Sequence, residues 1–225
     1  MGARVLYMLS KKMGLVILSL ALGGCQFIEP GIPGSGTMKR EVRVIEPFDR
    51  VSISGAANIE IVSGQSTGSC EVECDDNLLE YLATTVEDGE LKIHFLRRIS
   101  SSKSLQVWLA TEHLSKISAS GSVAVKVAGL DEPVTELDVS GSAKLQCAGK
   151  VERLEIHASG STAFDCLELA ADDVVINLSG SGKASLQANR TLKVAVSGSG
   201  SVQYLGTPEI EQNISGIGSV KPIEQ

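Results

Sequence analysis

Aromatic residues, histidines and basic residues are all scarce in this chain of 225 residues. Aromatic residues make up 4% of it, with one tryptophan, so few rings are available to stack against sugars. None of the three histidines, His94, His113 and His157, has a partner at metal-ligand spacing, so we expect no metal and no other cofactor. With 20 basic and 27 acidic residues the net charge is −7, which argues against binding to nucleic acid or to anionic lipid headgroups.

The N-terminus has only a short apolar stretch. Met13 to Leu22 spans ten residues, whereas a membrane-spanning helix needs about 20, so we predict that residues 1–24 are a signal peptide. The sequence Leu-Gly-Gly-Cys then ends at Cys25 and resembles the lipobox of bacterial lipoproteins. That resemblance implies cleavage between Gly24 and Cys25 and acyl chains on Cys25, which would hold the protein to a membrane. The alternative is a plain secretory signal followed by a coincidental cysteine.

The segment after the predicted cleavage site reads as a tether. Residues 25–39 contain two prolines and three glycines without apolar periodicity, which is typical of a flexible linker. Gln26 stands where an aspartate would be the usual inner-membrane retention signal, so we expect the protein to be anchored in the outer membrane, on either its surface or its periplasmic face. The mature chain would carry 17 basic against 27 acidic residues, a net charge of −10.

A serine–glycine pair recurs six times in the second half of the chain. Its steps of 20, 19, 20, 18 and 18 residues are typical of a solenoid, in which each repeat buries its apolar face against its neighbours. Apolar and polar residues alternate on both sides of each pair, which predicts strand, bend and strand. The six pairs begin at Ser120, Ser140, Ser159, Ser179, Ser197 and Ser215.

The alternation also predicts polar ladders on the outer face. One lies three residues before each glycine and is interrupted only by Ala195. A serine ladder directly after the glycines is broken in the sixth repeat by Ile217, and Pro222 would blunt the last edge strand. The first ladder consists of Ser118, Asp138, His157, Asn177 and Asn213.

We therefore predict an all-β fold, a parallel β-helix or stacked β-solenoid with SGS repeats of about 19 residues over 115–225. Residues 40–114 are expected to be a less regular β-rich portion that caps or flanks the stack, so that 40–225 form one continuous domain. Within this portion, Asp75 to Leu82 predicts one short helix, and Asp88-Gly89 predicts a tight turn before a strand from Glu90 to Phe95.

The repeats as a set resemble a known bacterial family. The blocks SGSVAV, SGSAKL, SGSTAF, SGSGKA and SGSGSV, the segments FDRVSISGAANIEIVSG and VEDGELKIHF, and the closing run YLGTPEIEQNISGIGSVK resemble the putative auto-transporter adhesin, head GIN domain, a domain of unknown function. The resemblance covers about residues 41–222. It implies an all-β, solenoid-like fold at the cell envelope and brings no catalytic residues.

Four cysteines lie within the predicted domain. Cys147 and Cys166 fall at equivalent inward positions of adjacent repeats, where their Cα atoms would lie about 4.8 Å apart, so we consider a disulfide between them. Small core cysteines are the alternative. Cys70 and Cys74 would lie about 13 Å apart along one strand, too far to bridge each other.

Two arrangements could carry catalysis, and both have a plainer explanation. Asp138 and His157 would be neighbours with Ser159 close by, but the bend places the serine too far away for a nucleophile–base pair. Glu136 and Glu155 are equivalent in adjacent repeats and could form a carboxylate pair, but we favour a solvated acidic face as their explanation.

We therefore expect no enzymatic activity, but a non-catalytic, adhesin-like lipoprotein of the cell envelope that binds or scaffolds through its solenoid faces. Its partners would be the membrane through its acyl chains, an envelope polymer or a host or cell-surface ligand, and a second copy in a homo-oligomer. A carbohydrate-active β-helix enzyme and a periplasm-facing accessory protein for envelope assembly stay open as alternatives.

Overall fold

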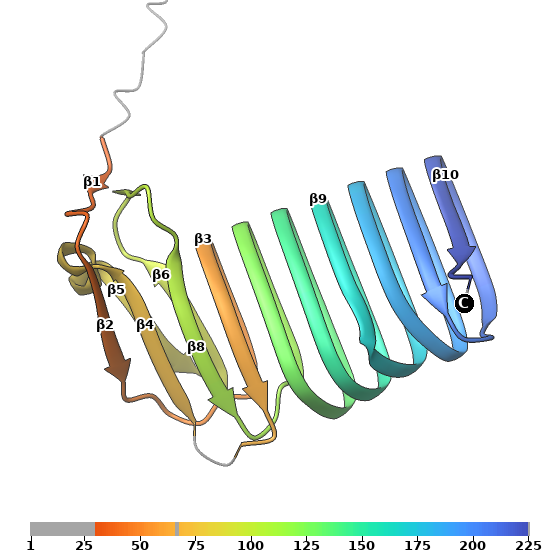
Figure 1. Cartoon of the computed structure of the whole chain (residues 1–225), viewed down its shortest axis with the longest axis horizontal. Coiled ribbons are helices and arrows are strands. Elements are labelled where there is room, and N and C mark those ends of the chain that lie inside the picture. The colour runs from red at the N-terminus through yellow and green to blue at the C-terminus, as the bar shows by residue number, and fades with distance from the viewer. Residues whose placement is uncertain (1–29, 66–67, 225) are drawn as a thin grey trace, which may run out of the picture.

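The computed structural model describes residues 30–65 and 68–224, and most of them lie in strands (Figure 1). The predicted all-β fold is confirmed. Parallel and antiparallel pairs combine in the main sheet, which follows the order β10-β9-β3-β8-β4-β2. The elements are β1 (Ile32–Pro33), β2 (Met38–Arg43), β3 (Arg50–Ser63), β4 (Ser69–Asp75), η1 (Asp76–Tyr81), β5 (Leu82–Glu87), β6 (Glu90–Phe95), β7 (Ile99–Ser100), β8 (Leu105–Thr111), β9 (Lys116–Leu205) and β10 (Glu209–Pro222).

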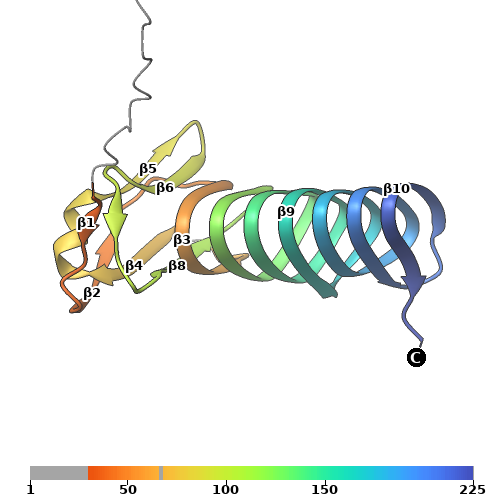
Figure 2. The same cartoon turned by 90° about the horizontal axis from the view of Figure 1, so that it is seen from above.

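The first five repeats form β9, a single continuous strand of 90 residues that winds as a coil (Figure 2), and the sixth repeat forms β10. We call each turn of this coil a rung, with β3 as the first rung and β10 as the last. β3 pairs in parallel with the start of β9, and β10 pairs in parallel with its end. In both pairings a corner glycine lies opposite a corner glycine, Gly55 opposite Gly121 and Gly216 opposite Gly198.

The glycines at the corners are required by both conformation and space. Gly160 has φ +105°, a region that L-residues rarely adopt. A Cβ on Gly160 would lie 2.4 Å from the carbonyl oxygen of Gly141, the corner glycine of the rung before it. The Ser-Gly pairs therefore mark the bends that the sequence predicts, and the backbones of successive corners pack directly on each other.

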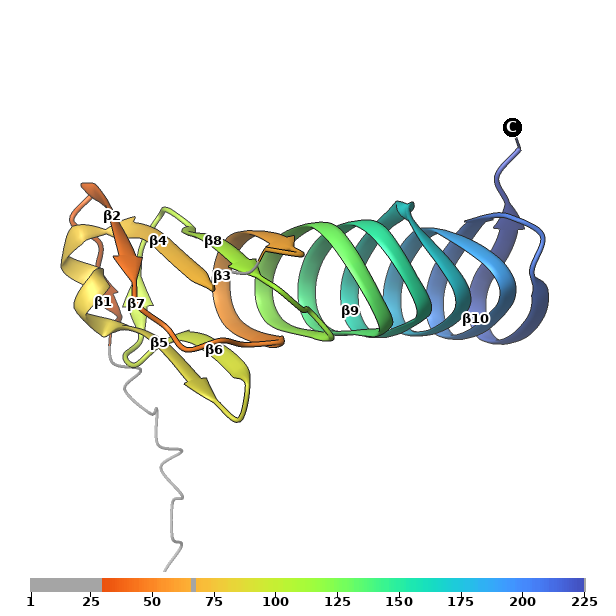
Figure 3. The same ribbon diagram turned by 90° about the horizontal axis from the view of Figure 1, so that it is seen from below.

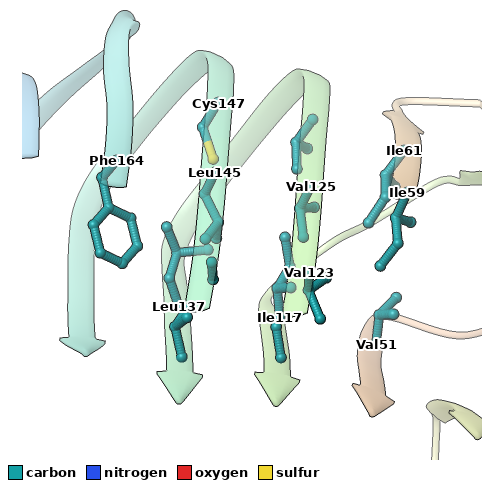
Figure 4. Close-up of a cluster of buried hydrophobic side chains, with 14 of the residues drawn as sticks. Val51, Ile59, Ile61, Ile117, Val123, Val125, Leu137, Leu145, Cys147 and Phe164 are labelled. Carbon is teal, nitrogen blue, oxygen red and sulfur yellow. The ribbon is translucent and has the colours of Figure 1, made fainter. Parts of the chain in front are cut away.

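One hydrophobic core runs through the coil. Alternate residues on both arms of each rung point inward, so equivalent side chains of successive rungs stack (Figure 4). Val51, Ile117 and Leu137 form one such row and are essentially inaccessible to solvent. The core continues without interruption from Phe48 in the N-terminal portion to Val202 in the penultimate rung.

The N-terminal portion covers the first rung. β8 and β6 pair in parallel with the two arms of β3, and β4 and β2 extend the sheet by antiparallel pairing. β5 and β6 form a hairpin that lies beside the coil (Figure 3), and its turn has φ +51° at Asp88 and +78° at Gly89, as expected for a tight turn. The predicted short helix is present as η1, a 3-10 helix of six residues.

The prediction of a flexible tether over residues 25–39 is wrong for its second half. Ile32 pairs with Ile99, and Met38 pairs with Asp75, so residues 32–33 and 38–39 are parts of strands. Buried Asp75 holds the segment between them, since its carboxylate accepts hydrogen bonds from the Gly36 amide at 2.7 Å and the Ser101 hydroxyl at 2.5 Å. These contacts could not be predicted from the sequence because the residues that hold the segment lie far along the chain. Among the described residues, no helix is long and apolar enough to cross a membrane.

Candidate functional site

A groove of about 740 Å³ runs along the outer face of the coil, before the corners. We call it the ladder groove. It runs from Ser52 in β3 to Asn213 in β10 and so crosses every rung. Its lining includes the predicted polar ladder and the column of corner serines, because outward residues alternate with core residues along each strand. These corner serines are Ser120, Ser140, Ser159, Ser179, Ser197 and Ser215.

The ladder residues interact between rungs. The Asn177 amide nitrogen lies 3.2 Å from His157 Nδ1, one rung away. Lys116 Nζ lies 2.6 Å from an Asp138 carboxylate oxygen and 3.1 Å from one of Glu136. The hydrogen bond to Asp138, followed by that to Glu136, raises the pKa of Lys116 against the opposing effect of desolvation. These three groups carry one positive and two negative charges, so a net charge of −1 stays beside the groove at this point.

One set of residues that could ligate a metal is evident only in the structure. One ligand atom each from Glu136, Asp138 and His157 lies within 4.8 Å of the other two. Two carboxylates and an imidazole suit a divalent transition metal, but the Lys116 ammonium already pairs with both carboxylates and would have to move away. The spacing of these residues in the sequence is not typical of a metal site, because Glu136 and Asp138 lie on one rung and His157 lies on the next.

In the described residues, the two catalytic arrangements considered from the sequence have other partners than those arrangements would need. Among these residues, Ser159 has no hydrogen bond to His157, whose side-chain partner is Asn177. Glu155 pairs with Arg153 at 2.5 Å, while Glu136 pairs with Lys116. Each carboxylate therefore has its own basic partner, which agrees with a solvated, charge-paired face.

A second groove of about 800 Å³ lies on the other side of the corners. Its lining includes the serine ladder that follows the glycines, together with Lys144 and Lys183. In the last rung Ile217 interrupts this ladder, as the sequence predicts, and its side chain is 84% exposed. The two grooves thus differ in charge, since the second is lined by two lysines and the ladder groove by the Asp138 carboxylate.

The structure has all four cysteines of the domain as buried, free thiols. The disulfide considered between Cys147 and Cys166 is absent, although the two side chains are inward-facing neighbours as predicted. The hydrogen bond with Cys147, together with burial, raises the pKa of Cys166 well above its usual value. Burial raises the pKa of Cys70 and of Cys74 to about 11, so at neutral pH these are unreactive core thiols.

The predicted lipidation and cleavage sites, Cys25 and Gly24, lie outside the described residues. They stay predictions from the sequence, as does the signal peptide over residues 1–24.

Comparison with known proteins gives a family and a set of related folds. The model of the family "Putative auto-transporter adhesin, head GIN domain" matches residues 47–208, which is more than half of the chain. A putative adhesin from Bacteroides fragilis is 20% identical with a TM-score of 0.69, the match covering 86% of this chain and 100% of that one. One from Parabacteroides distasonis is 21% identical with a TM-score of 0.56, over 86% and 100% of the two chains. No curated protein matches.

Proposed function

The chain belongs to the family described as putative auto-transporter adhesin, head GIN domain, and on this premise we propose that it is a non-catalytic, adhesin-like protein of the cell envelope that binds an extended polymer in the ladder groove. The single observation that carries the proposal is the course of the groove. It crosses all rungs from Ser52 to Asn213 and offers hydroxyl, amide and imidazole groups along its length.

The fold supports this reading because we interpret β3, β9 and β10 as one parallel β-solenoid with repeats of about 19 residues. Parallel pairing at both ends of β9 and the packing of each corner glycine on the previous one support that interpretation. Successive rungs would then repeat about every 4.8 Å along the groove. A polymer with a regularly repeating backbone can meet the same kind of hydrogen-bonding group at each step, whereas a compact ligand would use only a few rungs.

The chemistry of the groove favours hydroxyl- or amide-bearing ligands. Asp138 in its lining, with Lys116 and Glu136 beside it, leaves one net negative charge, so most of the groove offers uncharged groups. The weak single contacts of such groups add up over many rungs, as in multivalent binding. We therefore propose a linear glycan of the envelope or of a host surface as the ligand class.

Binding to immobilised polysaccharides tests this proposal directly. The probes are peptidoglycan and host mucin glycans, measured by surface plasmon resonance with the purified full-length chain. Ser159→Arg places a bulky cation in the ladder groove, and the matched control Ser161→Arg places it two residues away in the second groove. We expect the first variant to lose binding and the second to retain it.

Equal loss in both variants, or no binding to any probe, would contradict the ladder groove as the binding site. Release of reducing sugar ends from a bound polymer would contradict a non-catalytic role, and Glu136→Ala and Glu155→Ala would then be the first variants to assay.

We further propose that acyl chains on Cys25 hold the domain at the outer membrane, with the residues before β1 as the tether. Protease treatment of intact cells that carry a C-terminally tagged chain tests where the domain lies. Digestion on intact cells is expected for a surface adhesin. Protection until lysis would instead favour a partner inside the envelope. A Cys25→Ala variant, followed by labelled palmitate, tests the anchor separately.

A further inference from the structure

The C-terminal end of the coil is open. β10 pairs with β9 along its whole length through one edge, and no strand in residues 30–65 or 68–224 pairs with its other edge (Figure 1). Ile210 and Ile214 are 40% and 36% exposed, whereas their equivalents one rung earlier, Leu192 and Val196, are 0% and 2% exposed in the core. The core is therefore uncovered at this end, next to a free strand edge.

The opposite end of the coil is closed. The outer edge of β3 is occupied by β8 and β6, and β4 and β2 continue the sheet beyond β8. The sheet ends there at β2, so head-to-tail association would have to pair β10, which has 14 residues and a corner glycine, with a strand of six residues that contains no glycine. A second copy of β10 has the same length and the same corner, so a self-complementary contact fits the last rung better.

β10 has a form that suits such a pairing. The corner at Gly216 divides it into two arms of similar length, Glu209–Ser215 and Ile217–Pro222. A two-fold axis through this corner places the first arm of one copy over the second arm of the other, in antiparallel orientation. We propose that the open end binds a second copy of this chain by antiparallel pairing of β10 with β10, centred on Gly216.

Charge complementarity supports this register. Glu211 lies five residues before Gly216 and Lys221 five residues after it, so Glu211 of one copy lies opposite Lys221 of the second copy, twice in the dimer. Glu211 is 73% exposed on its side chain and contacts Lys193 of its own chain at 2.8 Å. Among the described residues, Lys221 has no ion-pair partner. The pairing would thus continue a column of alternating charge across the interface.

The other facing pairs are also compatible. On the core side, Ile214 lies opposite Gly218 of the second copy, so a large side chain meets a position without one. The outer side places Asn213 opposite Ser219 of the second copy, and these two polar groups can share a hydrogen bond. The interface would cover the exposed apolar residues and give the free edge hydrogen-bonding partners, which are the two liabilities of an open edge strand.

The first test is the mass of the full-length chain in mild detergent, measured by sedimentation equilibrium over a range of concentrations. We expect a concentration-dependent dimer. Lys221→Glu would place a like charge opposite Glu211 of the second copy at two sites and weaken association about tenfold. The matched control, Lys126→Glu, changes an exposed lysine at the equivalent position near the start of β9 and should leave the dimer unchanged.

A cross-link tests the register itself. The double variant Asn213→Cys with Ser219→Cys should form a covalent dimer under mild oxidation, whereas either single variant should not, because each new cysteine then lacks its opposite partner. A monomer at all concentrations would overturn the proposal. A dimer whose affinity is unchanged by Lys221→Glu and that forms no cross-link would also overturn it, since the contact would then lie elsewhere on the molecule.

Discussion

Replacing a corner glycine by alanine separates two reasons for its presence. Gly55 and Gly160 have nearly the same backbone conformation, with φ +114° and +105°. An alanine at either position therefore suffers a similar conformational strain, about 1–3 kcal/mol. The surroundings differ: a Cβ on Gly55 would meet nothing within 4 Å, whereas a Cβ on Gly160 would lie 2.4 Å from the carbonyl oxygen of Gly141.

The second cost applies only inside the stack. The carbonyl oxygen of Gly141 belongs to the backbone of a paired rung, so it cannot turn away as a flexible side chain would. Moving it aside is comparable to overpacking a core, which costs about 1–3 kcal/mol. We therefore expect Gly160→Ala to lower the free energy of unfolding by about 2 kcal/mol more than Gly55→Ala does. For a domain of this size, that difference corresponds to a further fall in Tm of about 4–8 °C.

The assay is thermal and urea unfolding of both variants and the parent chain, followed by far-UV circular dichroism. Because both variants carry the same chemical change, differences in the unfolded state largely cancel. Equal destabilisation by the two substitutions would refute the close approach of neighbouring corners. A larger effect at Gly55 would refute the assumption that strain is similar at the two corners.

Three further predictions concern single side chains. Hydrogen bonds from Arg190, and secondly from Thr191, lower the pKa of Asp173, so its ionised form stabilises the fold above the unfolded pKa of about 3.9. Asp173→Asn should therefore lower the free energy of unfolding at pH 7. Unfolding measured at decreasing pH should show the difference between the variant and the parent chain shrinking below about pH 4. Cys166 should resist alkylation by iodoacetamide at pH 8 in the folded chain and react once the chain is unfolded without reductant. Resistance that persists after unfolding would instead be evidence for the disulfide with Cys147, and peptide mass spectrometry distinguishes the two results. Phe164 is 3% exposed in the core, so Phe164→Ala should lower the free energy of unfolding by about 3–5 kcal/mol, measured by urea unfolding. A decrease of less than about 1 kcal/mol would contradict tight packing of this side chain.

Much of the coil could be predicted because its signals are local and repeated. Alternation with a period of two fixes which side chains face inward, and the same pattern recurs around every Ser-Gly pair. The polar ladder through Asp138 and His157, the inward positions of Cys147 and Cys166 and the break at Ile217 follow directly from that pattern. The Asp88-Gly89 turn was equally accessible, since this dipeptide favours the positive φ values that the turn needs.

The features that the sequence left undecided all depend on partners far along the chain. The segment from Ile32 to Lys39 resembles a linker by composition, but buried Asp75 and the strand at Ile99 hold it against the domain.

By itself, then, the sequence determined the repeat, the bends and the two faces of each strand, because neighbouring residues decide these. Only the tertiary structure decided that Lys116 pairs with both Glu136 and Asp138 and that the first rung is covered while β10 is open. These features arise where separate rungs and strands meet, and local alternation contains no information about which partner lies across the next strand edge.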